Sequence, residues 1–248
     1  MKKQNSEKIQ VALFGHGHLG KWHLDKLKAN PDVEVIAVVD PSAERFLAVE
    51  RRHPGTPCLK EPSSIIDQLD AALIITPTST HYSLLRELME QGIHIFCEKP
   101  MVTSTKEAEA LLTLSYSLRQ EKKDLPIIQI GHSERMHQIW EQRLNFPQFF
   151  RSPGLVRIDR LAAFKGRACD GDVITGLMIH DLDLLLYLFS ESPFSIQSTG
   201  YHSISKHWDT VSSTLHFPSG RVAILTVGRN YTEEKRQFEI INDCGTML

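Results

Sequence analysis

The sequence predicts an α/β protein with two domains, residues 1–125 and residues 126–248. Over the first 125 or so residues, short β-branched apolar runs alternate with helical patterns. Such continuous runs are typical of parallel strands buried on both faces, so a doubly wound sheet is expected there. After about residue 150, one helical pattern is followed by alternating runs. That change indicates a C-terminal α+β domain with a largely antiparallel, open sheet.

Each element follows from its local pattern. Parallel strands are expected at the apolar runs 9–15, 33–40, 71–76, 93–99 and 126–131. Apolar residues spaced by three and four predict helices over 19–30, 42–53, 81–92 and 104–120, and Gly92 stands where a helix ends. In the second domain we expect a helix over 176–189 and strands over 195–204, 209–217, 221–230 and 236–243. A Pro-Ser-Gly turn at 218–220 predicts a hairpin.

Composition excludes several classes of protein. Lys and Arg number 28 against 30 Asp and Glu, so no basic field favours nucleic acid or an anionic membrane surface. No window reaches the roughly 18 apolar residues of a spanning helix, and the start lacks the pattern of a signal peptide. The four cysteines lack metal-ligand or disulfide-framework spacing: Cys58, Cys97, Cys169 and Cys244. We therefore expect a cytoplasmic protein without a metal site.

A glycine-rich turn follows the first predicted strand and opens the first predicted helix. Its residues are Gly15, His16, Gly17, His18, Leu19 and Gly20. In a Rossmann fold, such glycines permit a tight turn, close approach to a pyrophosphate and tight helix packing, with the phosphates at the helix N-terminus. Asp40 ends the second strand, where a carboxylate accepts hydrogen bonds from ribose hydroxyls. No arginine follows directly in 41–43, so a 2′-phosphate would meet an uncompensated charge, which favours NAD over NADP.

Two further motifs follow strands of the same sheet, at the edge where ligands bind. The first contains Thr76, Pro77, Thr78, Ser79, Thr80 and His81. Its hydroxyls are as well suited to capping the next helix as to contacting a cofactor. The second is Glu98-Lys99-Pro100, in which Lys99 is placed to donate to a substrate oxygen. The proline restrains Lys99, and a cis bond there would aim that side chain inward.

His180 lies three residues before Asp183, on the same face of the helix expected at 176–189. Spacing alone leaves a buried core histidine, a proton acceptor and a metal ligand open, with the core reading favoured. A metal site is disfavoured because no second His or Cys stands at ligand spacing nearby.

These motifs, in this order, resemble the Gfo/Idh/MocA family of nicotinamide-dependent oxidoreductases over nearly the whole chain. The resemblance implies a sugar or cyclitol dehydrogenase in which Lys99 polarises the reacting hydroxyl and His180 is the general base. It also implies cofactor contacts from the glycine turn, Asp40, Thr76, Pro77, Thr78, His81, Glu98 and Lys99. Members of the family generally pair through the large sheet of the second domain, so a homodimer or homotetramer is expected.

Two stretches, 131–136 and 172–181, are similar to those of UDP-N-acetylglucosamine 3-dehydrogenases. This resemblance implies a UDP-sugar substrate and a 3-keto product. Arg135 is then a candidate for substrate phosphate, although a structural salt bridge is equally expected. A cluster of cations gives mild support for a nucleotide-sugar: Arg135, Arg143, Arg151, Arg157, Arg160, Lys165 and Arg167.

The sequence departs from the family pattern at two places. Gly176 stands where many members carry an aspartate, and Asp172 lies one turn too far back to replace it. Relatives usually continue past the point where this chain ends, so a shortened sheet with an unpaired edge is expected. Both departures leave open a cofactor-binding relative without catalysis, acting as a sensor or oligomer partner. A cyclitol or other small-molecule dehydrogenase is the third alternative.

Overall fold

The computed structural model describes residues 8–121, 125–164 and 171–248 and divides the chain into two compact units, Met1–Gly131 and His132–Leu248. The division falls a few residues after the boundary expected at 125–126, because the run at 126–131 supplies the last strand of the first sheet. Lys165, Arg167 and Cys169, singled out from the sequence, lie outside the described residues.

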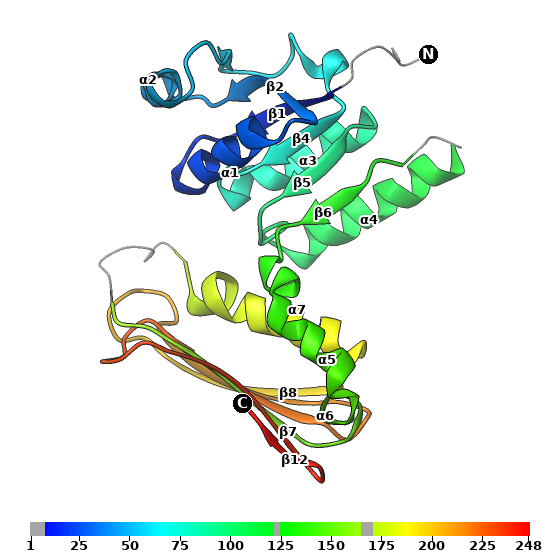
Figure 1. Ribbon diagram of the computed structural model, residues 1–248, viewed down its shortest axis with the longest axis vertical. Helices are drawn as coiled ribbons and strands as arrows, with labels where there is room; N and C mark the ends of the chain where they lie inside the picture. The colour runs from blue at the N-terminus through cyan, green and yellow to red at the C-terminus, as the bar shows by residue number, and fades with distance from the viewer. Residues whose placement is uncertain (1–7, 122–124, 165–170) are drawn as a thin grey trace. The chain divides into compact units, whose positions relative to one another are not determined.

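The first unit is a doubly wound parallel sheet, as the sequence predicts. Its strand order is β3-β2-β1-β4-β5-β6, and every pairing is parallel (Figure 1). The strands are β1 (Ile9–Phe14), β2 (Val33–Val39), β3 (Cys58–Leu59), β4 (Ala71–Ile74), β5 (His94–Cys97) and β6 (Ile128–Ile130). The order reverses between β1 and β4, and ligands bind at the carboxyl ends of strands at such a point.

Helices cover both faces of this sheet. They are α1 (His18–Ala29), α2 (Ala43–Arg52), α3 (His81–Glu90) and α4 (Thr105–Gln120), with short 3₁₀ turns η1 (Ile66–Gln68) and η2 (Thr78–Thr80). Ala12 and Phe14 of β1 pack into one buried cluster, whereas Leu13 between them packs into another. Burial on both faces explains why the strand reads as a continuous apolar run.

The second unit is built on a six-stranded sheet of order β12-β11-β7-β10-β9-β8. Its strands are β7 (Leu155–Leu161), β8 (Ser195–Tyr201), β9 (Thr210–His216), β10 (Val222–Gly228), β11 (Lys235–Asn242) and β12 (Gly245–Met247). All pairings are antiparallel except that of β7 with β10, so the largely antiparallel sheet is confirmed. The predicted hairpin joins β9 to β10, with Gly220 at a φ of 84°.

The helical residues of this unit include α7 (Ile179–Phe189), which is preceded by a π-helical turn, η5 (Ile174–Met178). Between β6 and β7 lie the short elements η3 (Ser133–Met136), η4 (Gln138–Glu141), α5 (Gln142–Asn145) and α6 (Pro147–Arg151). In Figure 1, α7 lies on one face of the sheet, and no helix of the described part covers the other face. Val156, Leu185 and Leu225 share the core between helix and sheet. No helix within the described ranges has the length and apolarity needed to cross a bilayer.

Candidate functional site

The glycine turn connects β1 to α1 and can be built only with glycine at two positions. Gly15 has a φ of 89°, and a Cβ added there would lie 2.7 Å from the carbonyl oxygen of Ile75. A Cβ on Gly20 would lie 2.2 Å from the carbonyl oxygen of Gly15. Gly17 is the N-cap of α1 and has no side chain to occupy the helix N-terminus. The backbone of the turn is therefore tightly packed at Gly15 and Gly20, and the N–H groups at the start of α1 are left available to an anion.

Asp40 fastens this turn to the end of β2. Its carboxylate is buried and accepts the N–H of His16 at 2.8 Å, the N–H of Ser42 at 2.9 Å and Nη1 of Arg45 at 2.9 Å. Burial opposes ionisation, but these hydrogen bonds hold the pKa of Asp40 below its ordinary value. The expectation of an uncompensated negative charge is therefore wrong, because α2 turns Arg45 back onto Asp40.

His16 is the buried residue at the tip of the turn, with 2% of its surface exposed. Neither ring nitrogen has a hydrogen-bond partner among the described residues, and burial lowers the pKa of the imidazole. His18 and Leu19 are exposed at the start of α1. Buried polar atoms are rarely left without partners in a folded protein, so the orphaned His16 nitrogens fit a turn completed by a polar ligand.

The motif after β4 folds as a 3₁₀ turn followed by α3. Thr80 is the N-cap of α3, but its hydroxyl lies 2.7 Å from Oγ1 of Thr76 and 2.9 Å from the carbonyl oxygen of Pro77 and does not cap the helix. Thr78 begins the turn. His81 is buried, and its two ring nitrogens lie 2.9 Å from the carbonyl oxygen of Thr76 and 3.0 Å from that of Pro100. His81 thus bridges two loops of the same edge.

The segment Glu98-Lys99-Pro100 leaves β5 at that edge, with a cis bond between Lys99 and Pro100 as the sequence suggested. Glu98 accepts Nε2 of His23, on α1, at 3.0 Å and the N–H of Lys99 at 3.2 Å. Burial would raise the pKa of Glu98, but the hydrogen bonds from His23 and Lys99 keep it below its ordinary value. Sequence reasoning missed His23, since nothing in its local pattern points to a partner far along the chain.

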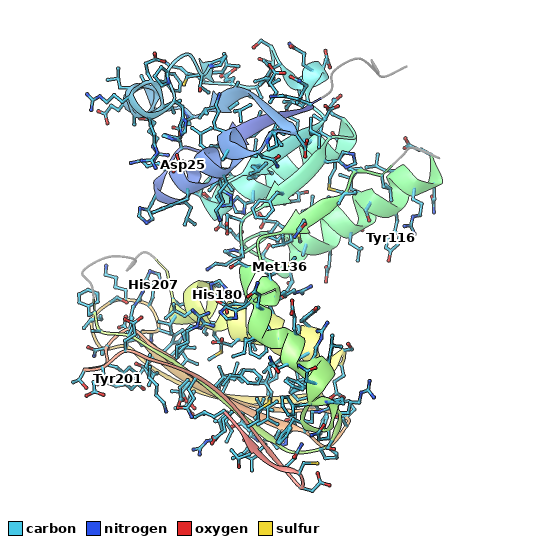
Figure 2. The ribbon with its side chains drawn as sticks, viewed as in Figure 1. Asp25, Tyr116, Met136, His180, Tyr201 and His207 are labelled. Atoms are coloured by element: carbon cyan, nitrogen blue, oxygen red, sulfur yellow. The ribbon has the colours of Figure 1, made fainter. Side chains whose placement is uncertain are left out.

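In the second unit, His180 is the second residue of α7 and is half-buried (Figure 2). One turn later, Asp183 accepts Nε of Arg135 at 2.8 Å and Nη2 of Arg135 at 2.5 Å. The guanidinium of Arg135 also lies 5.3 Å from the ring centroid of Tyr187. Of the two alternatives for Arg135, the structure contains the salt bridge.

The π-helical turn before α7 contains Gly176, the position at which this sequence departs from the family pattern. Gly176 is exposed, and a Cβ added to it would meet no atom within 4 Å. Asp172 caps the turn, with Oδ1 accepting the N–H groups of Ile174 at 2.9 Å and Thr175 at 2.8 Å. The Asp172 carboxylate therefore stabilises the start of this turn.

A cavity of about 380 Å³ opens between α5, α6 and the C-terminal half of α7. It is lined by Arg143, Leu144, Pro147, Phe150, Arg151, Tyr187, Leu188 and Ser190. The guanidinium of Arg143 lies 4.7 Å from the ring centroid of Tyr187. Two cations beside an aromatic ring and apolar side chains suit an anionic ligand with a flat, partly apolar part.

Comparison with known proteins covers both units. A model of an oxidoreductase family with an NAD-binding Rossmann fold matches residues 9–120, and one of the GFO/IDH/MocA C-terminal domain matches residues 138–248. The chain is 32% identical over 234 residues to UDP-N-acetylglucosamine 3-dehydrogenase of Acidithiobacillus ferrooxidans, covering 94% of this chain and 71% of that protein. A solved structure of that enzyme has a TM-score of 0.83, with 94% of this chain and 74% of the other covered.

Inositol dehydrogenases are also similar. Inositol 2-dehydrogenase of Rhizobium meliloti is 24% identical over 240 residues, covering 90% of this chain and 70% of that protein. The fold also matches scyllo-inositol dehydrogenase of Lactobacillus casei, solved with NAD(H) and scyllo-inositol, with a TM-score of 0.82 at 18% identity and 97% and 75% of the two chains covered. From its glycine turn to its second sheet, the chain belongs to the GFO/IDH/MocA family of NAD-binding oxidoreductases.

Proposed function

We propose that this protein is an NAD-dependent dehydrogenase that oxidises a ring hydroxyl of a UDP-sugar such as UDP-N-acetylglucosamine to the 3-keto product. The observation that carries the proposal is the convergence of the glycine turn, Asp40 and Lys99 at one edge of the first sheet. The 32% identity to a UDP-N-acetylglucosamine 3-dehydrogenase supports the substrate class.

The residues of the first unit fit a dinucleotide. Gly15 and Gly20 allow the tight turn, and the N-terminus of α1 at Gly17 would hold the pyrophosphate. Asp40 follows the end of β2 and would accept hydrogen bonds from the adenosine ribose. Bound NAD supplies the acceptor for the hydride that leaves the sugar carbon. In this proposal the Lys99 ammonium donates to the reacting oxygen, and His180 takes the hydroxyl proton.

The assay that tests this proposal follows NADH formation from NAD with UDP-N-acetylglucosamine or myo-inositol. Turnover with the nucleotide-sugar supports the proposal, whereas turnover with inositol alone assigns a cyclitol dehydrogenase. The non-catalytic alternative rests on Gly176, which stands where many family members carry an aspartate. The open space around Gly176 would accommodate such a carboxylate, but the chain does not supply one. It requires that the wild-type chain turns over neither substrate.

The preference for NAD gives the first prediction. NADH is expected to bind about tenfold more tightly than NADPH, because Arg45 only partly offsets the repulsion between the Asp40 carboxylate and a 2′-phosphate. Asp40→Ala should remove most of that preference. Arg45→Ala should increase it, since Arg45 is the cation that contacts the carboxylate. Fluorescence titration with both nucleotides measures the ratio, and a ratio below one for the wild type would contradict the assignment to NAD.

The cavity beside Tyr187 gives the second prediction. We propose that Arg143 and Arg151 bind the diphosphate of the nucleotide-sugar there, so replacing both with alanine should raise KM for UDP-N-acetylglucosamine about tenfold or more. The value of kcat should change little, because neither residue contacts the reacting carbon in this proposal. Arg119→Ala, which replaces an exposed arginine in the last turn of α4, is the control. Equal KM values for the double variant and the control would mean that the cavity is not part of the substrate site.

A further inference from the structure

The Glu98-Lys99-Pro100 segment is held on both sides by histidines from two different helices. On one side, Nε2 of His23 donates to Oε1 of Glu98 at 3.0 Å. On the other side, Nδ1 of His81 lies 3.0 Å from the carbonyl oxygen of Pro100. Lys99 stands between these two attachments. Its backbone N–H also donates to Oε2 of Glu98 at 3.2 Å, so the anchored carboxylate reaches the lysine itself.

The two histidines lie on the helices that directly follow the two loops expected to hold a dinucleotide. His23 lies on α1, whose N-terminus is the glycine turn. His81 opens α3 directly after the turn at Thr78–Thr80, and its Nε2 lies 2.9 Å from the carbonyl oxygen of Thr76. Each histidine therefore connects a cofactor-side loop to the lysine segment.

The surroundings leave Glu98 and His81 little room to move. A Cβ on Gly131 would lie 3.0 Å from Oε2 of Glu98, so this carboxylate packs directly against the end of β6. The His23 ring packs against Phe96, with 5.4 Å between ring centroids. His81 is 1% exposed. Fixed partners of this kind keep a catalytic side chain in a productive position.

The hydrogen-bond chemistry of His81 adds a constraint. A carbonyl oxygen only accepts, so each ring nitrogen must carry a proton to bond the carbonyl that it faces. The neutral ring satisfies either Thr76 or Pro100, and the doubly protonated ring satisfies both. The Cys97 thiol lies 3.4 Å from Nδ1, and burial raises its pKa to about 12, so it stays protonated beside the ring.

We propose that His23 and His81 are positioning residues that together fix Lys99 relative to the glycine turn and the Thr76 loop. The inference rests on the proposed function, in which Lys99 contacts the reacting oxygen. It assigns no chemical step to either histidine. Neither ring needs to touch substrate. Their task is to set where the Lys99 ammonium stands when a dinucleotide occupies the edge of the sheet.

The test compares His23→Ala with His23→Gln, whose amide N–H can still donate to Glu98. The matched control is His53→Ala, because His53 bonds a carboxylate of the same helix, Asp25, at 2.8 Å without leading to Lys99. With UDP-N-acetylglucosamine and NAD, kcat should fall about 10- to 100-fold in His23→Ala and recover in His23→Gln. The dissociation constant of NADH should change less than about threefold.

A second readout follows Lys99 without turnover. The protein is reductively methylated with ¹³C-formaldehyde, and the Lys99 signal is identified by its loss in Lys99→Arg. This signal should shift toward those of exposed lysines in His23→Ala and His81→Ala, and stay in place in His23→Gln and His53→Ala. An unmoved Lys99 signal in both alanine variants overturns the inference, as does an equal loss of kcat in His53→Ala. Absence of wild-type turnover contradicts the proposed function instead, and the Lys99 signal still decides the role of the histidines.

Discussion

Replacing Lys99 with alanine is expected to lower kcat for UDP-N-acetylglucosamine oxidation by about 10²- to 10⁴-fold, the range typical of a lost proton-transfer or polarising group. The NADH dissociation constant should stay within about threefold of the wild type, because the glycine turn and Asp40 carry most cofactor contacts in the proposed site. His180→Ala should lower kcat similarly. Steady-state kinetics and NADH fluorescence titration measure the two quantities.

The physical reason is that, in the proposed reaction, the alcohol loses a proton as its hydride leaves. A cation at the oxygen stabilises the charge that develops there, and a base of near-neutral pKa removes the proton. Lys106→Ala is the control, since Lys106 is an exposed lysine in the first turn of α4. If Lys99→Ala keeps more than about a tenth of the wild-type kcat, Lys99 has no part in the chemistry.

Replacing Asp209 with alanine is expected to lower the free energy of unfolding of the second unit by about 3–5 kcal/mol. Asp209 is fully buried, and its Oδ2 accepts the N–H groups of Ser203, Ile204 and Ser205 at 2.8, 2.8 and 3.0 Å. Its Oδ1 accepts Nε of Arg229 at 2.8 Å. Removing the carboxylate leaves the three N–H groups, in the loop that carries His207 (Figure 2), without this acceptor, and Arg229, which is 11% exposed, loses its carboxylate partner.

Urea denaturation of the wild type and the variant measures this loss. Asp159→Ala is the control, because Asp159 also pairs with a cation, Lys235, on the same sheet. That lysine is 46% exposed, so its pair should contribute no more than about 1 kcal/mol. Equal losses in the two variants would mean that burial does not set the energy of the Asp209 network.

The same carboxylate gives the second unit a pH dependence. Burial opposes its ionisation, but the hydrogen bonds from Ile204, Ser203 and Ser205 and the bond from Arg229 hold its pKa far below the ordinary value. Its contribution is therefore complete above about pH 4, the ordinary pKa of aspartate, and is lost as the pH falls further. The wild type should lose more stability between pH 6 and pH 3 than Asp209→Asn.

Much of the fold could be predicted because its elements have strong periodic patterns. The observed α1 to α4 begin and end within one or two residues of the ranges read from apolar spacing. The central strand β7 was missed, although Val156 and Ile158 alternate with Arg157 and Asp159 in the expected way. Its single parallel pairing and the short helices before it depend on contacts with distant residues, which local sequence does not encode.

The site shows the same division. The glycine turn and Asp40 could be predicted from spacing, since a strand-turn-helix frame fixes where they lie. The pairing of Arg45 with Asp40 was not predicted, because Arg45 lies beyond residues 41–43 and reaches the strand end only through the first turn of α2. The contact of His23 with Glu98 joins residues far apart in sequence and has no local signal. Partners of this kind are found only once the chain is folded.

The position of β7 also determines when the second unit can form during synthesis. Its two neighbours are β10 and β11, both of which follow it much later in the chain. The first sheet is complete once β6 has left the ribosome, but β7 then emerges with neither partner available. It must wait through the synthesis of α7, β8 and β9, with unpaired backbone and apolar side chains open to chaperones or to other nascent chains. Of the described strands of the second sheet, the central one therefore waits longest for a partner.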